Sequence, residues 1–93
     1  MRIYASVGPF AGDKDAAAHI RETYLKPEIM KGNVALLDFA DVNLATQSFI
    51  HALIAAVVRN DPDSLDKINF SNCNDEIRSV IQIVVDYAQN QFE

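Results

Sequence analysis

The chain has 93 residues, of which 49% are apolar and 23% charged, and this composition is typical of a single globular domain spanning residues 1–93. Its net charge of −5 and its singly scattered Lys and Arg residues leave no basic surface for nucleic acid or an anionic membrane. One cysteine, no signal-peptide apolar region and no apolar stretch of bilayer length favour a soluble, cytoplasmic protein.

The first third of the chain predicts a strand, a turn and a helix. Arg2–Val7 alternates apolar and polar residues and ends at a Gly-Pro pair, which is typical of a strand with one buried side. Gly8–Gly12 is the expected turn. Asp13 is a suitable N-cap for a helix over Lys14–Leu25, and Pro27 is expected to end that helix because the residue before a proline avoids the helical region.

The middle of the chain predicts a central strand followed by a buried helix. Val34–Phe39 is apolar without alternation, so we expect both faces of this strand to be covered. Asp41–Ala45 forms a short polar hinge, and Thr46 is the expected cap of the next helix. That helix is apolar nearly all round, which indicates burial on more than one side or an apolar face kept for a partner.

The last third predicts a turn, a short strand and an amphipathic helix. Residues 60–64 form a turn cluster, and Lys67–Ser71 is the expected third strand. Asn72–Asp75 is rich in capping residues, and an apolar stripe at helical spacing follows it. The order is βαβαβα, which predicts an α/β fold with a mostly parallel sheet of three or four strands packed by three helices.

A pattern in the middle of the chain is similar to that of a known family. The pattern begins with two apolar residues followed by Asp and Phe, and a Val comes three residues after the Phe. A short hinge follows, and then a Ser-Phe pair begins an apolar helix. The chain therefore resembles the STAS-like domains, which are small bacterial α/β domains related to anti-sigma-factor antagonists. The residues that carry the resemblance are Leu36, Leu37, Asp38, Phe39, Asp41, Val42, Ser48, Phe49, Leu53 and Val57.

The resemblance implies a regulatory interaction rather than a reaction. In the antagonists, the hinge carries an Asp-Ser-Ser-Gly motif whose serine is phosphorylated by a partner kinase, which switches binding to an anti-sigma ATPase. Ser48 matches a serine of that motif, whereas Thr46 stands at the acidic position and Phe49 at the glycine. The Ser-Phe pair fits the STAS-like branch to which no biochemical role is assigned.

Three residues near the hinge are candidates for chemistry. Ser48 lies in the first turn of the second helix, where a phosphate would be favourable, although Thr46 and Ser48 can also act only as caps. Asp38 lies at the carboxyl edge of the predicted sheet, where it could be a phosphoacceptor, a metal ligand or, as we expect, a hydrogen-bond acceptor for the hinge backbone. His51 lies one turn beyond Ser48, but a hydrolase would also need the missing Gly-x-Ser-x-Gly elbow.

We expect a non-enzymatic protein-interaction module without a cofactor. We expect no metal site, because His19, His51 and Cys73 have no zinc-site spacing. The resemblance suggests a regulatory kinase or ATPase of the anti-sigma type as the partner, with phosphorylation at Ser48 or Thr46 as a switch. The alternative is a small ligand-binding or catalytic domain that uses Asp38, Ser48 and His51. Self-association as a homodimer through the second helix is a third possibility. The expected partner-binding residues are Asp41, Asn43, Gln47, Ser48, Phe49 and Ile50.

Overall fold

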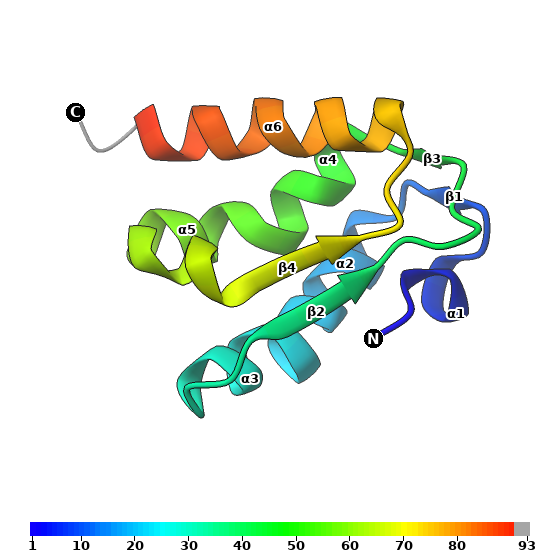
Figure 1. The fold of residues 1–93 in the computed structure, drawn as a ribbon. Helices are drawn as coiled ribbons and strands as arrows, with labels where there is room; N and C mark the ends of the chain where they lie inside the picture. Colours follow the sequence, from blue (N-terminus) through cyan, green and yellow to red (C-terminus); the bar gives the residue numbers. More distant parts are fainter. Residues whose placement is uncertain (91–93) are drawn as a thin grey trace.

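A computed structural model of the chain describes residues 1–90 as a layer of helices beside short parallel strands (Figure 1). The helices are α1 (Ile3–Val7), α2 (Lys14–Ile20), α3 (Lys26–Met30), α4 (Gln47–Ile50), α5 (Ala56–Asn60) and α6 (Asp75–Asn90). The strands are β1 (Phe10–Ala11), β2 (Ala35–Asp38), β3 (Leu44–Ala45) and β4 (Ile68–Ser71). Two π turns, η1 (Arg21–Leu25) and η2 (His51–Ala55), and a 3₁₀ helix, η3 (Pro62–Lys67), complete the described elements.

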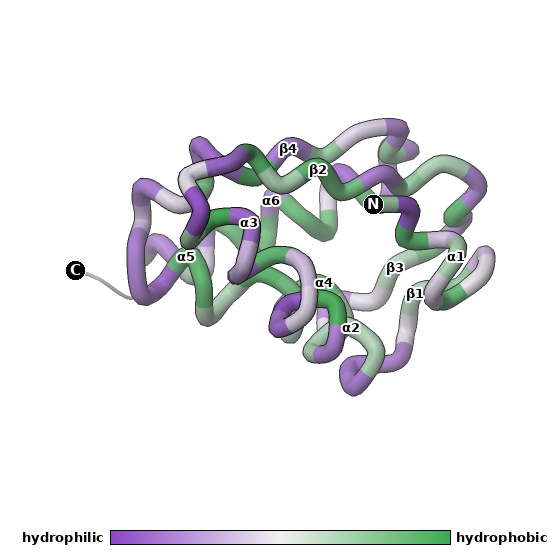
Figure 2. Tube along the Cα trace, turned by 90° about the horizontal axis from the view of Figure 1, so that it is seen from below, coloured by the Kyte–Doolittle hydropathy of each residue, from purple (hydrophilic) through white to green (hydrophobic). Residues whose placement is uncertain are grey.

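The strands form two small parallel sheets instead of the single sheet of three or four strands expected from the sequence. β2 pairs with β4, and β1 pairs with β3. The α/β class is confirmed, but each sheet has only two strands, fewer than the three or four predicted for one sheet. The helices lie on one side of the β2–β4 sheet, as Figures 1 and 2 show from two directions, and its other face is open.

The prediction of a strand at Arg2–Val7 is wrong, because most of this segment forms helix α1. Only its beginning is extended: the Asp38 N–H donates to the Met1 carbonyl over 2.9 Å, and Arg2 forms a single parallel bridge to Asp38. Ile3 and Val7 are four residues apart, so the helix places both on one side, where Ile3 is fully buried. The apolar residues of this short segment fit the two-residue spacing of a strand as well as the four-residue spacing of a helix. Tertiary packing selects the helix.

The first predicted helix begins as expected but does not stop before Pro27. The Asp13 side chain accepts hydrogen bonds from the N–H groups of Asp15 and Ala16, as an N-cap does. The helix then runs through η1 into α3 and ends at Met30. The wider π turn gives room to the proline ring, which a regular helix would press against the carbonyl four residues earlier.

The second predicted helix is confirmed as a continuous helix from α4 through η2 to α5, residues 47–60. Its apolar residues are enclosed: Phe49, Ile50 and Leu53 are fully buried. At η2, the Ala52 carbonyl accepts a hydrogen bond of 2.8 Å from the Arg21 guanidinium. Since Arg21 belongs to η1, this bond joins the π turns of the two neighbouring helices.

The central strand is covered on one face only, which corrects the prediction of two covered faces. Ala35 and Leu37 are fully buried under the helices. Leu36 and Val34 are 42% and 58% exposed, respectively, on the open side of the sheet. The strand therefore alternates in burial, as the strands of a sheet with one open face do, although its sequence does not alternate.

The C-terminal elements agree with the sequence. β4 and α6 occur where a strand and a helix were predicted, and the turn cluster at residues 60–64 opens the 3₁₀ helix η3 with Asp61 as its cap. Asn74 caps α6 by accepting a hydrogen bond of 2.8 Å from the Ile77 N–H. Among residues 1–90, every helix falls short of the length and apolar character that crossing a membrane requires.

One-sided burial of β2 predicts unequal effects of two leucine substitutions. Leu37→Ala is expected to lower the free energy of unfolding by about 2–5 kcal/mol, because a fully buried side chain leaves a cavity. Leu36→Ala, one residue away on the open face, should cost about 1 kcal/mol or less. Urea unfolding followed by circular dichroism measures both values, and equal losses would contradict the burial pattern.

Candidate functional site

The hinge is held in place by backbone hydrogen bonds to the segment before the first long helix. The Asn43 N–H donates to the Pro9 carbonyl over 2.8 Å, and the Thr46 N–H donates to the Ala11 carbonyl over 2.9 Å. These bonds flank the β1–β3 pair. The start of the second helix therefore has a fixed position relative to the glycine-rich turn.

Thr46 is the N-cap of the second helix, as predicted. Its hydroxyl oxygen accepts a hydrogen bond of 3.1 Å from the Phe49 N–H. Ser48 lies within the first turn, and its side chain is exposed. The two hydroxyls thus differ, because that of Thr46 is engaged in capping and half-buried whereas that of Ser48 is open to solvent.

Ser48 lies in a shallow surface cavity formed where α2, the second helix and α6 meet. The cavity has a volume of about 470 Å³ and brings Ser48 and His51 together, one helical turn apart. Lys14 of α2 and Tyr87 of α6 lie in the same cavity. Sequence reasoning had missed both, because their proximity depends on how three helices pack. The lining residues are Lys14, Gln47, Ser48, His51, Ala52 and Tyr87.

The expected partner-binding residues divide into exposed and buried ones. Asp41, Asn43 and Gln47 are exposed, as Ser48 is. Phe49 and Ile50 are fully buried, so the expectation that they form part of a docking surface does not hold. Consecutive residues of a helix both become buried when neighbouring elements cover a wide sector of it, and here α4 packs against both α2 and α6.

Asp38 lies at the end of β2 and stabilises the turn that follows. One of its carboxylate oxygens accepts hydrogen bonds of 2.9 Å from the Asn72 amide and from the Ala40 N–H. The bond from Asn72 is the largest cause that lowers the pKa of Asp38 below its ordinary value of 3.8, and the bond from Ala40 is the next. Asp38 does not line the cavity that holds Ser48 and His51, so the structure does not bring the three residues to one site.

The remaining candidate residues have structural surroundings. Asp41 adopts a positive φ of 68° at the turn and forms an exposed ion pair of 3.4 Å with Arg2. Burial raises the pKa of the Cys73 thiol, which disfavours a reactive thiolate. Within residues 1–90, no cluster of three or more His, Cys, Asp or Glu side chains is arranged to hold a metal ion.

A comparison with protein families matches residues 16–78 to the STAS-like domain of unknown function. The match covers more than half of the chain and both the central strand and the second helix. The chain therefore belongs to this family of STAS-like domains, as the pattern around Asp38 and Ser48 indicated. Comparisons with curated proteins and with solved structures gave no match. Membership relates the chain to regulatory interaction domains and leaves its biochemical role open.

The cause of the lowered pKa of Asp38 can be tested with Asn72→Gly. Glycine keeps the positive φ of 56° at this position but removes the amide, so the pKa of Asp38 is expected to rise toward 3.8. NMR titration of the carboxyl carbon measures this value. Asn69→Gly, in the strand β4 that precedes Asn72, is the control and should leave the pKa of Asp38 unchanged.

The same bond makes stability depend on pH. Because the pKa of Asp38 is lower in the folded chain, its contribution to stability is present above the unfolded value and is lost as pH falls through the folded one. The free energy of unfolding should therefore decrease less in this acidic range for Asn72→Gly than for the unchanged chain. An unchanged Asp38 pKa in the variant would show that the Asn72 amide is not the main cause.

Proposed function

We propose that this protein is a non-enzymatic regulatory module that docks on a partner protein through residues 41–53. The observation that carries the proposal is the exposed Ser48 at the start of a helix whose other side is buried in the core. Exposed polar side chains on a rigid element can contact a partner without refolding. Asp41, Asn43, Gln47 and Ser48 are the residues proposed to contact it.

A switch by phosphorylation of Ser48 fits the surroundings of its hydroxyl. A phosphate there would add a charge of about −1.5 to −2 in the first helical turn, where the helix dipole favours an anion. Lys14 lines the same cavity and forms no ion pair with any residue that the structure describes. Its ammonium group would pair with the phosphate.

The proposed effect on docking follows from charge and bulk together. The cavity around Ser48 has both polar and apolar lining residues, and the phosphate would act by filling it and by outweighing the positive charge of Lys14. A partner that contacts Gln47 and Ser48 in the unmodified protein would then lose these contacts. Thr46 is a less suitable acceptor, because its hydroxyl caps the helix.

The proposed partner is a nucleotide-binding regulatory kinase or ATPase of the anti-sigma type. This part rests on the relation of the family to regulatory interaction domains. A catalytic role for Ser48 and His51 is not favoured, because Asp38 is hydrogen-bonded to Asn72 and Ala40 and does not line their cavity. A hydrolytic triad needs an acidic group to orient the histidine.

The docking surface can be tested with a phosphomimetic variant. Ser48→Glu is expected to lower the affinity for the partner at least about tenfold, whereas Ser48→Ala should bind nearly as the unchanged chain does. Asn69→Glu, which places a similar charge on the open face of the sheet, is the control and should bind normally. The partner is first captured from a host lysate with Ser48→Ala, and affinities are then measured by calorimetry with the purified proteins.

Two outcomes would contradict the proposal. Equal affinities of Ser48→Glu and Ser48→Ala would remove the switch from Ser48. Binding that is lost in Asn69→Glu but kept in Ser48→Glu would move the docking surface to the open face of the sheet.

A further inference from the structure

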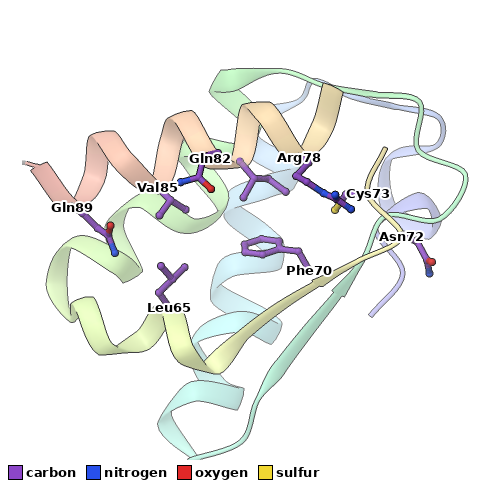
Figure 3. Close-up of a pocket in the computed structure, with 9 residues that line it drawn as sticks. Leu65, Phe70, Asn72, Cys73, Arg78, Gln82, Val85 and Gln89 are labelled. Carbon is purple, nitrogen blue, oxygen red and sulfur yellow. The ribbon is translucent and has the colours of Figure 1, made fainter. Parts of the chain in front are cut away.

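A second cavity lies between β4 and α6, away from Ser48 (Figure 3). It has a volume of about 370 Å³, and we call it the β4–α6 groove. Phe70 projects from β4 toward α6, and Leu65 and Val85 face the same space in Figure 3. The groove therefore has an apolar floor. Its lining residues are Leu65, Phe70, Asn72, Cys73, Arg78, Ile81, Gln82, Val85 and Gln89.

The strand beside this groove has an unpaired edge. The Phe39 N–H donates to the Ser71 carbonyl over 2.9 Å, so the backbone groups of Asn69 and Ser71 point toward β2. Those of Ile68 and Phe70 must therefore point to the opposite edge. The Ile68 N–H bonds back to the Leu65 carbonyl.

The backbone of Phe70 has no such partner. Among residues 1–90, β2 is the one strand paired with β4, and no hydrogen bond to the N–H or carbonyl of Phe70 occurs on the free edge. An unpaired strand edge is a template for another strand. Here the edge runs beside an apolar groove, so backbone pairing and side-chain burial are available to the same ligand.

We infer that the β4–α6 groove binds an extended peptide segment of a partner protein, which adds as a strand along the free edge of β4. The peptide backbone would bond to the N–H and carbonyl of Phe70 and to the carbonyl of Ile68. Its side chains alternate in direction, so every second one would enter the groove between Phe70 and Val85. The ligand is therefore a segment with apolar residues at alternating positions.

The charge of the groove defines one further feature of this peptide. Arg78 is the one charged residue among the lining residues, on a protein whose net charge is −5. Its side chain is exposed, it takes part in no ion pair with a residue of the described part of the chain, and it extends toward Cys73 and Asn72 (Figure 3). An acidic group of the peptide would pair with Arg78 at the end of the groove where β4 ends.

The groove shares no lining residue with the cavity around Ser48. Docking at residues 41–53 and peptide binding at β4 can therefore fail or succeed separately. Ser48→Glu should leave peptide binding unchanged, which distinguishes the two sites.

The inference is tested with a phage-displayed library of random twelve-residue peptides selected on the full chain. We expect enriched peptides to carry alternating apolar residues and an Asp or Glu, and a synthetic consensus peptide to slow hydrogen exchange of the Phe70 amide by about tenfold or more. N-methylation of the peptide at its β4-facing nitrogens should abolish binding, because strand addition needs these donors.

Arg78→Glu is the protein variant that tests the charge. It should weaken binding of the acidic consensus peptide about tenfold or more, whereas Lys67→Glu, an exposed cation outside the groove, is the matched control. Both positions are exposed, and circular dichroism checks that both variants fold. The inference is overturned if no peptide is enriched, if bound peptides protect another surface, or if N-methylated peptides bind as well as unmodified ones.

Discussion

The fold depends on the enclosure of the helix at residues 47–60. Phe49, Ile50 and Leu53 are fully buried in the hydrophobic core, where α4 and η2 pack against α2 and α6. The bond from Arg21 to the Ala52 carbonyl fixes this helix against the first one. Because these contacts set where the helix begins, they also set where Ser48 meets solvent. Packing on one side of the helix thus positions the candidate site on the other.

Much of the fold could be predicted where a local signal is strong. The caps at Asp13 and Thr46 follow from side chains that satisfy the first N–H groups of a helix, and the stripe of α6 follows from helical spacing. The prediction failed where tertiary packing decides. Arg2–Val7 fits a strand and a helix equally well, and the π turn before Pro27 leaves no signal in single residues. Leu36 is apolar yet exposed, so composition alone could not show which face of β2 is open.

The candidate site was predicted only in part, for a similar reason. Ser48 and its place in the first helical turn could be predicted from the sequence. The presence of Lys14 in the same cavity as Ser48 depends on the packing of α2, and the free edge of β4 depends on strand order. Both are properties of the assembled fold. Two surfaces without shared residues would allow one small domain to bind two partners.

Cysteine labelling tests most directly whether this helix is enclosed while Ser48 remains open. In a Cys73→Ser background, Ser48→Cys and Val58→Cys each place one thiol on the helix, exposed in the first case and fully buried in the second. Reaction rates with a thiol reagent are measured in the folded state and in urea. The structure predicts nearly equal rates for Ser48→Cys in the two states and at least about a hundredfold protection for Val58→Cys when folded. Similar protection of the two thiols would contradict the account.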